Sequence, residues 1–600
     1  MSGFCGFAGK VNEDIIQKML SCLRTDCSYA PICFDDGYVH LGYVPYTKED
    51  LNKVGHNDNY TIWVMLDTDG SKEMTPNSVI ASYEKNGPAF LKEADGIFSG
   101  ILWDGIRKRL YLFRDRYGAK PLFYAKTEEG LVFGTNINAV LTHNSVSKNV
   151  NFQAVYEYLS FQSVYAPETV FMDVRHILPG CYGIYERELF RENGYAKLPF
   201  GEVSKDDFEQ AAQKTDELLK QSVGKNLIVD GSGIFLSGGL DSSYIAALAN
   251  GKFKYSFCLK PQTNKNSIHN KEEDAFFAGY LAKEYGMEHY IFEMTPTDLI
   301  DSVDDILKAF SQPFSGTMST YFLAKKASDI CKTIYTGDGA DELFGSYRHH
   351  SVLPALEKYI AYKKSGVDPC VKKKEFAPYE DSLLFLESVY QFGGEKDTLW
   401  YYRLLQMTDD DKGLFLNEDR FGPFVKRKAT LNRIWQWDNM LQSKDSVNRS
   451  LERDFKHLLP GHTMLYQDTL ARRFGINLNM PFLNRTLTDY VVTLPGEYKI
   501  RDGQTKALLK HAAKCRLPKE IVERRKEPFS LPILEWLKGE LKEYLTDMLS
   551  ESSIKRHGLL DEKSIQYALS EFYRQPDEKE YYGLLLWSLA MLERWAFLYI

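Results

Sequence analysis

The sequence predicts a protein of two domains, α+β in the first part of the chain and α/β in the second. The chain has 600 residues, which is more than one hydrophobic core usually serves. Up to about residue 200 it is rich in short strand-like runs, and beyond that point short apolar runs alternate with amphipathic helices. Such alternation is typical of a doubly wound parallel sheet. We therefore expect domains at 1–200 and 205–600, with a mainly helical part towards Ile600.

The strands expected in the first domain are short and rich in β-branched and aromatic residues. Residues 60–65 and 110–113 are two examples, and both are bounded by Gly, Asp or Asn. The pattern changes at about 201–206. From Phe208 onwards apolar residues recur with helical spacing, and Ser204 is the expected N-cap. A domain boundary near residue 200 follows.

In the second domain, strands and helices are expected to alternate along the chain. The predicted strands are 233–236, 255–259 and 333–336, and the predicted helices include 244–248 and 275–285. We find no internal repeat and no low-complexity segment.

The composition argues against several classes of function. A formal charge of -8 argues against a general binder of nucleic acid or of membrane surfaces. No stretch approaches about 18 uncharged apolar residues, so no membrane span is expected, and the N-terminus has no signal-peptide pattern. The 9 cysteines are scattered and contain no C-x-x-C pair, so neither a zinc site nor a disulfide framework is predicted. A cytoplasmic protein with reduced thiols fits these features best.

One segment, 237–243 (Ser-Gly-Gly-Leu-Asp-Ser-Ser), has the features of a phosphate-binding loop. It connects an expected strand to an expected helix, and its two adjacent glycines let the backbone turn tightly and approach a ligand. Hydroxyls and free N–H groups at a helix start bind anions, and parallel sheets bind ligands at the carboxyl ends of their strands. The G-x-x-x-x-G-K-[ST] spacing of a Walker loop is absent. The acid Asp241 suits Mg²⁺ placed between it and phosphates, and the alternative is a plain connection that needs glycine for its shape.

This loop resembles the pyrophosphate loop of N-type ATP pyrophosphatases. Nearly the whole chain resembles the asparagine synthetase family, which includes β-lactam synthetase and lasso-peptide cyclases. The further segments that carry the resemblance are 114–122 (RDRYGAKPL), 336–345 (TGDGADELFG), 480–483 (MPFL), 503–510 (GQTKALLK) and 525–532 (RKEPFSLP). The resemblance implies a first domain like class II glutamine amidotransferases, an Ntn-hydrolase-like β sandwich with helices. It implies an ATP-pyrophosphatase synthetase domain with a doubly wound parallel sheet after it.

The resemblance also implies the cofactors ATP and Mg²⁺ and a set of binding residues. The residues expected to contact the nucleotide are Leu236, Ser237, Gly238, Gly239, Leu240, Asp241, Ser242, Ser243, Cys258, Leu259 and Gly337. Among them, Cys258 and Leu259 match the position where the family's backbone holds adenine. Asp241 and Asp341 are the expected Mg²⁺ ligands, with N-capping of the following helices as the alternative for both.

Two more residues are expected to act in the reaction. Asp338 occupies the family position that faces the attacking amine, where a carboxylate could accept a proton. Lys506 could stabilise charge on pyrophosphate or on the tetrahedral centre, and its alternative is a solvated surface lysine. The implied reaction has two steps: a carboxylate attacks the α-phosphorus of ATP to give an acyl-adenylate and pyrophosphate, and an amine then expels AMP. The protein mainly positions reactants and neutralises charge.

The first domain departs from the glutamine-dependent members of the family. Their catalytic cysteine follows the initiator Met, so that its free amino group serves as base, whereas Cys5 here follows four residues. Other family segments are replaced at 25–28 (TDCS), 41–46 (LGYVPY), 64–66 (VML) and 75–78 (TPNS). Unless a propeptide is removed before Cys5, we expect a buried structural cysteine and an inactive glutaminase.

The second domain departs more selectively. The family's Glu-x-Arg reads 477–479 (NLN), the Asp after Pro-Phe-Leu is Asn484, and Asp-Glu-Pro-Phe reads 311–314 (SQPF). We interpret these as charged groups replaced by neutral ones near the acyl pocket, which puts aspartate in doubt as the substrate.

Three hypotheses follow. The first is a glutaminase-dead cyclase that closes a lactam, acting on a carboxylate-bearing substrate such as a precursor peptide with an associated leader-processing protein. The second is a divergent asparagine synthetase-like enzyme that uses ammonia, favoured by Asp338 because β-lactam synthetase has tyrosine there. The third is a non-catalytic scaffold, against which the intact Asp241, Asp341 and Lys506 count. No nucleic-acid or membrane partner is expected, and the oligomeric state is left open.

Overall fold

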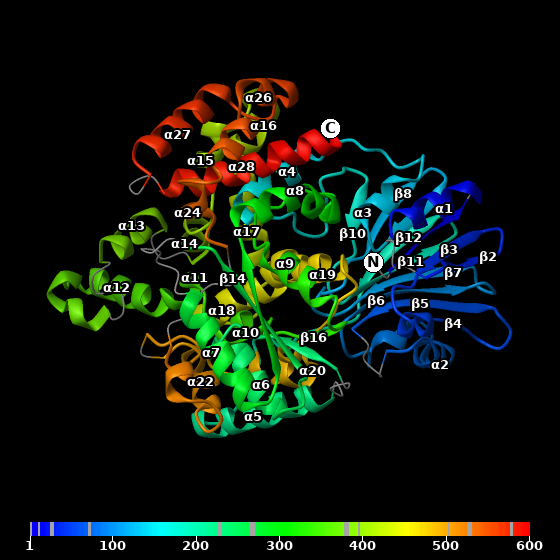
Figure 1. Ribbon diagram of the computed structural model, residues 1–600, viewed down its shortest axis with the longest axis horizontal. Coiled ribbons are helices and arrows are strands. Elements are labelled where there is room, and N and C mark those ends of the chain that lie inside the picture. Colours follow the sequence, from blue (N-terminus) through cyan, green and yellow to red (C-terminus); the bar gives the residue numbers. More distant parts are fainter. Residues whose placement is uncertain are drawn as a thin grey trace.

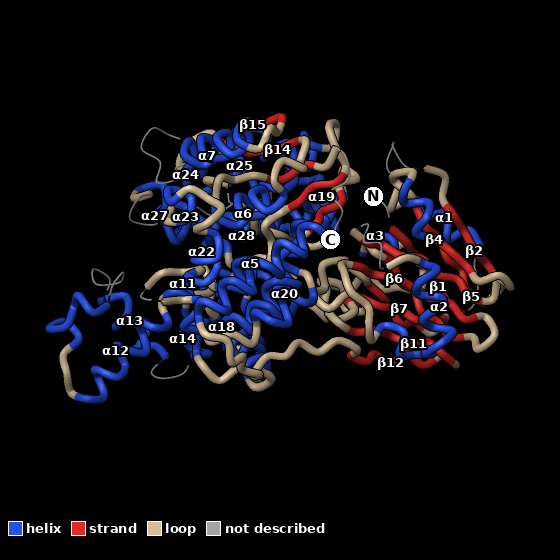
Figure 2. Tube along the Cα trace, turned by 90° about the horizontal axis from the view of Figure 1, so that it is seen from below, coloured by secondary structure: helices blue, strands red, loops and turns tan. Residues whose placement is uncertain are grey.

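The computed structural model of this chain describes residues 3–9, 13–24, 29–69, 74–225, 231–263, 271–376, 383–393, 397–501, 503–524, 531–576 and 580–600. Strands gather at one end of the molecule and most helices at the other (Figure 2). The strand-rich end is the first domain, drawn in blue and cyan in Figure 1. The C-terminal helices are drawn in orange and red, away from the blue strands.

The first domain contains two antiparallel six-stranded sheets. One sheet has the order β10-β8-β9-β1-β3-β2, and the other has the order β12-β11-β7-β6-β5-β4. The strands of the first are β1 (Gly3–Gly9), β2 (Ile32–Asp35), β3 (Val39–Val44), β8 (Phe123–Thr127), β9 (Gly130–Gly134) and β10 (Val174–His176). Those of the second are β4 (Val54–His56), β5 (Ile62–Thr68), β6 (Phe98–Asp104), β7 (Arg109–Arg114), β11 (Cys181–Glu186) and β12 (Leu189–Gly194).

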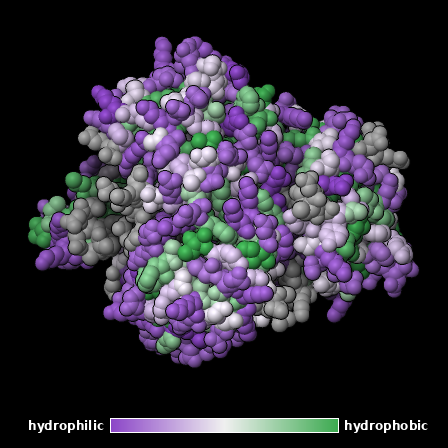
Figure 3. Space-filling model, in the orientation of Figure 1, coloured by the Kyte–Doolittle hydropathy of each residue, from purple (hydrophilic) through white to green (hydrophobic). Residues whose placement is uncertain are grey.

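The two sheets pack face to face, and helices cover their outer faces. Side chains alternate along each strand, so Phe4 of β1 and Trp103 of β6 both enter the core between the sheets. α1 (Glu13–Ser21) packs on the first sheet and α2 (Pro76–Asn86) on the second. The face of the molecule in Figure 3 is largely hydrophilic, with apolar side chains in small groups. The expected sandwich with helices is therefore present.

The second domain begins with α5 (Phe208–Lys225), and its cap differs from the expected one. Asp207, not Ser204, caps this helix: its Oδ1 accepts from Gln210 N at 2.9 Å, and Gln210 Oε1 accepts from Asp207 N at 3.0 Å. Ser204 instead accepts from Asp206 N at 3.3 Å. The reciprocal pair satisfies two N–H groups at once, which a serine three residues earlier cannot do.

A five-stranded parallel sheet follows, in the order β15-β14-β13-β16-β17. Its strands are β13 (Gly233–Phe235), β14 (Tyr255–Pro261), β15 (Glu288–Met294), β16 (Thr333–Tyr335) and β17 (Asn477–Asn479). The connecting helices are α6 (Leu240–Ala249), α7 (Lys271–Glu284), α8 (Pro296–Phe310) and α9 (Ser319–Ala327). The chain moves outward from β13 to β15 and then returns to β16 on the other side of β13. This confirms the predicted doubly wound sheet and puts its switch point between β13 and β16.

The remaining residues are mainly helical, as predicted. Helices that matter for the site are α10 (Ala340–Phe344), α11 (Arg348–Ser351), η5 (Asp454–Thr463), a π-helical segment, α19 (Met464–Arg472) and α22 (Ala507–Ala513). α12 (Leu353–Ser365) and α13 (Leu383–Gly393) project at the left of Figure 1. The last helix, α28 (Glu580–Tyr599), contacts the first domain, where Tyr158 OH donates to Ser588 O at 2.9 Å. Within the described residues, no helix combines the length and apolar character that crossing a membrane requires.

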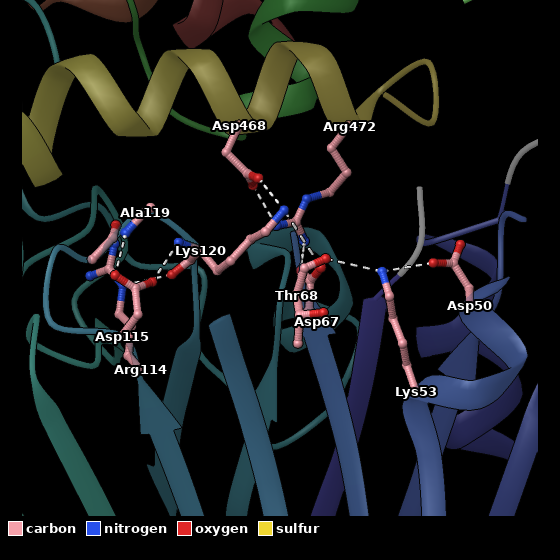
Figure 4. Close-up of polar contacts among 11 residues, drawn as sticks. Asp50, Lys53, Asp67, Thr68, Arg114, Asp115, Ala119, Lys120, Asp468 and Arg472 are labelled. Atoms are coloured by element: carbon pink, nitrogen blue, oxygen red, sulfur yellow. Dashed lines mark hydrogen bonds and ion pairs between the residues drawn. The ribbon is translucent and has the colours of Figure 1, made fainter. Parts of the chain in front are cut away.

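A buried charge network joins the two domains (Figure 4). Lys120 Nζ lies 2.6 Å from Asp468 Oδ1 on α19 and 3.8 Å from Asp67 Oδ1 on β5. Arg472, one turn beyond Asp468, contacts both carboxylates. The turn 114–122 holds Lys120 in place, because Arg114 Nε donates to Lys120 O at 2.7 Å. This family-like segment of the first domain thus connects it to the second.

Candidate active site

The loop between β13 and α6 turns sharply at the carboxyl end of the central strand. Gly238 has a φ of +67°, and a Cβ there would lie 2.6 Å from the carbonyl oxygen of Asp274, so this turn requires glycine. Ser237 N donates to Ser242 Oγ at 3.2 Å, and Gly239 N donates to Ser237 Oγ at 3.3 Å. The hydroxyls therefore shape the loop that carries the first turn of α6.

The loop between β16 and α10 lies directly against the first one. A Cβ on Gly337 would lie 2.8 Å from Asp241 Cβ, so the close approach of the two loops depends on this glycine. Asp241 and Asp341 each lie in the first turn of a helix, but the N-cap residues are Gly239 and Gly339, and neither cap has a side-chain hydrogen bond. The two aspartates are therefore not N-caps.

Lys506 lies between these two carboxylates. Its Nζ is 2.5 Å from Asp241 Oδ2 and 2.5 Å from Asp341 Oδ1, and its backbone N donates to Gly345 O at 3.1 Å. Burial alone would lower the pKa of this lysine, but the two carboxylates outweigh burial and raise it. Lys506 is therefore a buried cation and not a solvated surface lysine.

The same geometry bears on Mg²⁺. One positive group contacts an oxygen of both Asp241 and Asp341, so the two carboxylates are close enough to share a single cation. Carboxylate oxygens are ligands that Mg²⁺ prefers. This donor set fits the expected ion, because the single Lys506 ammonium leaves one negative charge of the pair unbalanced.

Asp338 lies on the same side of the sheet. Its Oδ1 accepts from Gln467 Nε2 at 2.9 Å, and Gln467 Oε1 in turn accepts from Thr320 Oγ1 at 2.6 Å, which fixes the amide. Asp338 Oδ2 is buried and has no hydrogen-bond partner among the described residues. Burial, with a contribution from the charges of Asp341 and Asp241, raises the pKa of Asp338 to about 6. A carboxyl with that pKa is suited to exchange protons near neutral pH.

These groups line one cavity of about 490 Å³, within the usual range of small-molecule sites. The predicted residues that line it are Leu236, Ser237, Gly239, Leu240, Asp241, Ser242, Cys258, Leu259, Gly337, Asp338, Asp341 and Lys506. Two of the residues predicted to contact the nucleotide, Gly238 and Ser243, do not line it. Gly238 packs its backbone against α7, and Ser243 is 0% exposed inside α6.

A second cavity, of about 790 Å³, borders the other side of η5. None of the predicted site residues lines it. Several of its charged side chains are already paired, since Arg433 contacts Glu157 and Glu168 and Lys456 contacts Glu452. We therefore place the candidate site at the smaller cavity.

Several lining residues were not predicted from the sequence. Glu342 is 1% exposed and accepts from Tyr347 OH at 2.8 Å and from Thr463 Oγ1 at 3.0 Å. Burial raises the pKa of Glu342 to about 7, and the Asp341 charge acts in the same direction. Its place inside 336–345 was a usable signal, whereas Thr463 and Gln467 come from η5 and α19, far along the chain and outside any motif.

Arg524 is a further unpredicted residue of the wall. It donates to Gly238 O at 3.3 Å and to Asp274 Oδ1 at 2.6 Å, so it braces the loop after β13 against α7. It directly precedes the family-like segment 525–532, of which 525–530 lies outside the described residues.

At the cysteine position of the first domain, the surroundings differ from those of the cavity. Cys5 lies in β1, is 0% exposed, and packs with the apolar residues under α1. Burial raises the pKa of its thiol well above the usual value. At the replaced segment 75–78, Thr75 and Ser78 form a reciprocal cap of α2. The replaced segment 25–28 lies outside the described residues.

The amides that suggested a changed acyl pocket lie outside the lining of this cavity, and the change of the acyl pocket stays a prediction. Asn477, Asn479 and Asn484 are not among the residues that line the cavity. Asn484 caps α20 (Arg485–Val491) by accepting from Thr486 N at 3.1 Å. Gln312 accepts from Val170 N at 3.1 Å and so joins the two domains. The side chains of Asn484 and Gln312 therefore serve the fold.

Comparison with known proteins agrees with the motifs. The family model of asparagine synthase matches residues 214–596, and that of a glutamine amidotransferase domain matches 71–196. Asparagine synthetase [glutamine-hydrolyzing] 1 of Bacillus subtilis is 24% identical over 91% of this chain and 90% of its own length. A putative asparagine synthetase of Mycobacterium tuberculosis is 24% identical over 89% and 80%, and an amidase chyE of Penicillium rubens is 23% identical over 83% and 79%.

Among solved structures, a glutamine phosphoribosylpyrophosphate amidotransferase from B. subtilis matches with a TM-score of 0.23 and 11% identity, over 48% of this chain and 65% of its own. A likeness this weak does not bear on the fold. The family match is different in kind, because it spans more than half of the chain and includes the loops that build the cavity. The protein is a ligase of the asparagine synthetase type, which forms AMP and diphosphate, and its chain belongs to the asparagine synthase family.

Proposed function

We propose that this enzyme adenylates a carboxylate with ATP in the 490 Å³ cavity and lets an amine other than glutamine-derived ammonia attack the acyl-adenylate. The observation that carries the proposal is the convergence of Asp241, Asp341 and Lys506 beside the loop after β13, on a cavity that Asp338 also lines. A buried cation between two carboxylates, next to the N-terminal turn of a helix, suits a polyphosphate.

Each residue has a proposed role. The first turn of α6 binds phosphate oxygens, and the wall at Cys258 and Leu259 receives the adenine. Mg²⁺, when bound, supplies charge neutralisation of the phosphates, and Asp241 and Asp341 would hold it. Lys506 leaves the carboxylates to contact developing negative charge. Asp338 accepts a proton from the attacking amine.

The first domain is proposed to be inactive as a glutaminase. A nucleophilic cysteine needs a thiolate and access to its substrate. Burial of Cys5 and its raised pKa oppose both. The side chains of Thr75 and Ser78, at the position where the family holds glutamine's charged end, are occupied in capping α2. The amine then arrives with the substrate or from solution.

We favour a lactam-forming cyclase, of the lasso-cyclase or β-lactam-synthetase type, over an ammonia-dependent enzyme. The proposal follows from the missing glutamine site, because an amine within the substrate needs no ammonia source. The substrate is then a carboxylate-bearing molecule with its own amine, such as a precursor peptide presented by a leader-processing protein. The carboxylate of Asp338 supports the second candidate, a divergent ammonia-using asparagine synthetase. A non-catalytic scaffold is disfavoured because the charged constellation is complete.

The test traps the acyl-adenylate with hydroxylamine, which takes the place of the natural amine whatever that amine is. The protein is incubated with ATP, Mg²⁺ and a panel of carboxylates, peptides included, and hydroxylamine converts activated acids to hydroxamates. We expect hydroxamate and AMP with the true substrate, and exchange of labelled pyrophosphate into ATP that depends on it. Formation of asparagine from aspartate and ammonia would favour the second candidate, the ammonia-using asparagine synthetase, over the cyclase. Glutamine hydrolysis above background would contradict an inactive first domain.

A further inference from the structure

A histidine-rich cluster lies on the wall of the cavity, apart from the residues assigned above. It consists of His349 and His350 on α11 and Asp454 at the start of η5. His349 Nε2 lies 2.5 Å and His350 Nε2 2.9 Å from the same oxygen, Asp454 Oδ2. One ligand atom from each residue lies within 4.8 Å of the others. The side chains of His350 and Asp454 are 0% exposed, whereas His349 lines the cavity.

Hydrogen bonding within the protein leaves this cluster incompletely satisfied. Among the described residues, His350 Nδ1 is buried without a hydrogen-bond partner, and His350 Nε2 approaches only Asp454, at 2.9 Å. Asp454 Oδ1 is also buried without a partner. Buried polar atoms are almost always paired in folded proteins, so two such atoms in one cluster, His350 Nδ1 and Asp454 Oδ1, point to a missing ligand.

The donor set identifies the class of that ligand. Two imidazole nitrogens and a carboxylate are typical ligands of Zn²⁺ and of neighbouring first-row divalent ions. Mg²⁺ prefers oxygen ligands, so this cluster is chemically distinct from the Asp241–Asp341 pair. We propose that His349, His350 and Asp454 bind one divalent transition-metal ion of the zinc class, with an open coordination position on the side where His349 meets the cavity.

The position of the ion gives it a structural consequence. α11 and η5 are also the elements that flank Glu342, since Tyr347 directly precedes α11 and Thr463 ends η5, and both donate to that carboxylate. The His349 ring stacks on Tyr347, with centroids 5.5 Å apart. An ion held by both elements therefore cross-links the wall that carries Glu342. This inference requires no ATP chemistry and stands apart from the proposed function.

The test uses the full chain, stripped with a chelator and measured without ATP or Mg²⁺. Co²⁺ is titrated as a spectroscopic probe, and Zn²⁺ is then used to displace it. We expect one equivalent of Co²⁺ per chain with visible d–d bands, and H349A, H350A and D454N to lose the bands. Their affinity should fall by more than the roughly 10–100-fold that loss of an outer hydrogen-bond partner causes. H511A is the matched control, because His511 is more exposed and pairs with Glu209 outside the cluster.

The melting temperature provides a second measurement, which does not depend on how much of each variant can be purified. An ion that binds only the folded chain raises its melting temperature with concentration, so Zn²⁺ should raise the Tm of the wild type and of H511A but not of H350A or D454N. The proposal is overturned if the folded wild type gives no Co²⁺ bands. It is equally overturned if H350A and D454N bind Co²⁺ as tightly as the wild type.

Discussion

The cysteine position of the first domain and the cavity of the second are both buried, but they bury different chemistry. Cys5 packs among apolar side chains under α1, and burial raises the pKa of its thiol, with Cys22 and Cys33 acting in the same direction. In the cavity, Lys506 is also buried, at 4% exposed, and stays charged because Asp241 and Asp341 each lie 2.5 Å away.

The difference shows what burial needs before it can support chemistry. A buried ionisable group keeps its charge only when opposite charges or hydrogen bonds replace water. The second domain provides these from β13–α6, β16–α10 and the turn before α22, whereas the first domain provides apolar packing around Cys5. The comparison implies that activity should respond strongly to changes in the cavity and hardly at all to changes at Cys5.

The largest effect is expected for Asp241→Ala. Removing this carboxylate leaves Lys506 with a single partner, Asp341, and removes one of the two acids proposed to hold Mg²⁺. Substrate-dependent exchange of pyrophosphate into ATP should fall at least roughly 10³-fold, at or beyond the upper end for loss of one charge-stabilising group. Asp301→Ala, which removes an exposed carboxylate on α8, is the control and should leave the exchange unchanged. Substantial pyrophosphate exchange in the Asp241 variant would contradict the claim that activity depends on the charged groups of the second domain.

A smaller effect is expected for Asp338→Asn, with a change in pH dependence. The pKa of Asp338 is raised to about 6, and only its ionised form can accept a proton. The rate of the amine step should therefore rise with pH, reach half its maximum near pH 6, and level off above it. Asparagine at this position should lower the plateau roughly 10²-fold, at the low end for loss of a general base, and remove the rise.

The measurement is kcat/KM across about pH 5–9, the range that brackets the pKa of this base, at a constant concentration of unprotonated amine, with pyrophosphate exchange followed in parallel. Exchange reports the adenylation step and should change little in the variant. A wild-type profile that is flat on both sides of the pKa, or a variant that keeps the rise, would exclude Asp338 as the base.

Much of the second domain was predictable from the sequence, because its signals are local. The strands ending at Phe235 and Tyr335 are short apolar runs followed by glycine and acid, so both loops could be expected at one edge of a sheet. Lys506 could be assigned only through the family resemblance, since nothing local shows that a lysine 265 residues from Asp241 lies between two carboxylates.

The residues that do not line the cavity as expected have physical reasons of the same kind. Gly238 and Ser243 belong to the loop motif, but Gly238 packs against α7 and Ser243 is buried inside α6. The sequence motif alone does not show which residues of the turn face the cavity. Asn484 and Gln312 were interpreted as pocket residues, whereas they cap a helix and bind backbone. Gln467 and Thr463 come from α19 and η5, where only the tertiary fold reveals their contacts.

An intermediate effect, on stability, is expected where the two regions meet. Asp468 is 4% exposed, and although burial acts to raise its pKa, the charges of Arg472 and Lys120 lower it. Asp468→Asn leaves both cations short of a partner, and breaking such a buried pair destabilises by about 3–5 kcal/mol. Urea unfolding followed by tryptophan fluorescence should reveal an earlier transition. Lys555→Met, which removes an exposed i,i+4 pair with Glu551, should cause no measurable shift. Equal behaviour of the two variants would mean that the network does not hold the domains together.

The smallest effect is expected for Cys5→Ala. The raised pKa and the burial of the thiol oppose its reaction, so its loss should leave pyrophosphate exchange and hydroxamate formation unchanged, and neither the variant nor the wild type should hydrolyse glutamine above background. The cost should be limited to packing, about 1 kcal/mol for one buried heavy atom beneath α1. Both the variant and the wild type are assayed with glutamine and with free ammonia, so that the result can contradict the expectation as well as support it. If glutamine supports amide formation in the wild type and Cys5→Ala removes only that activity, then Cys5 becomes accessible in the working enzyme. In that case both domains would be active, and they would differ only in when their sites become accessible to substrate.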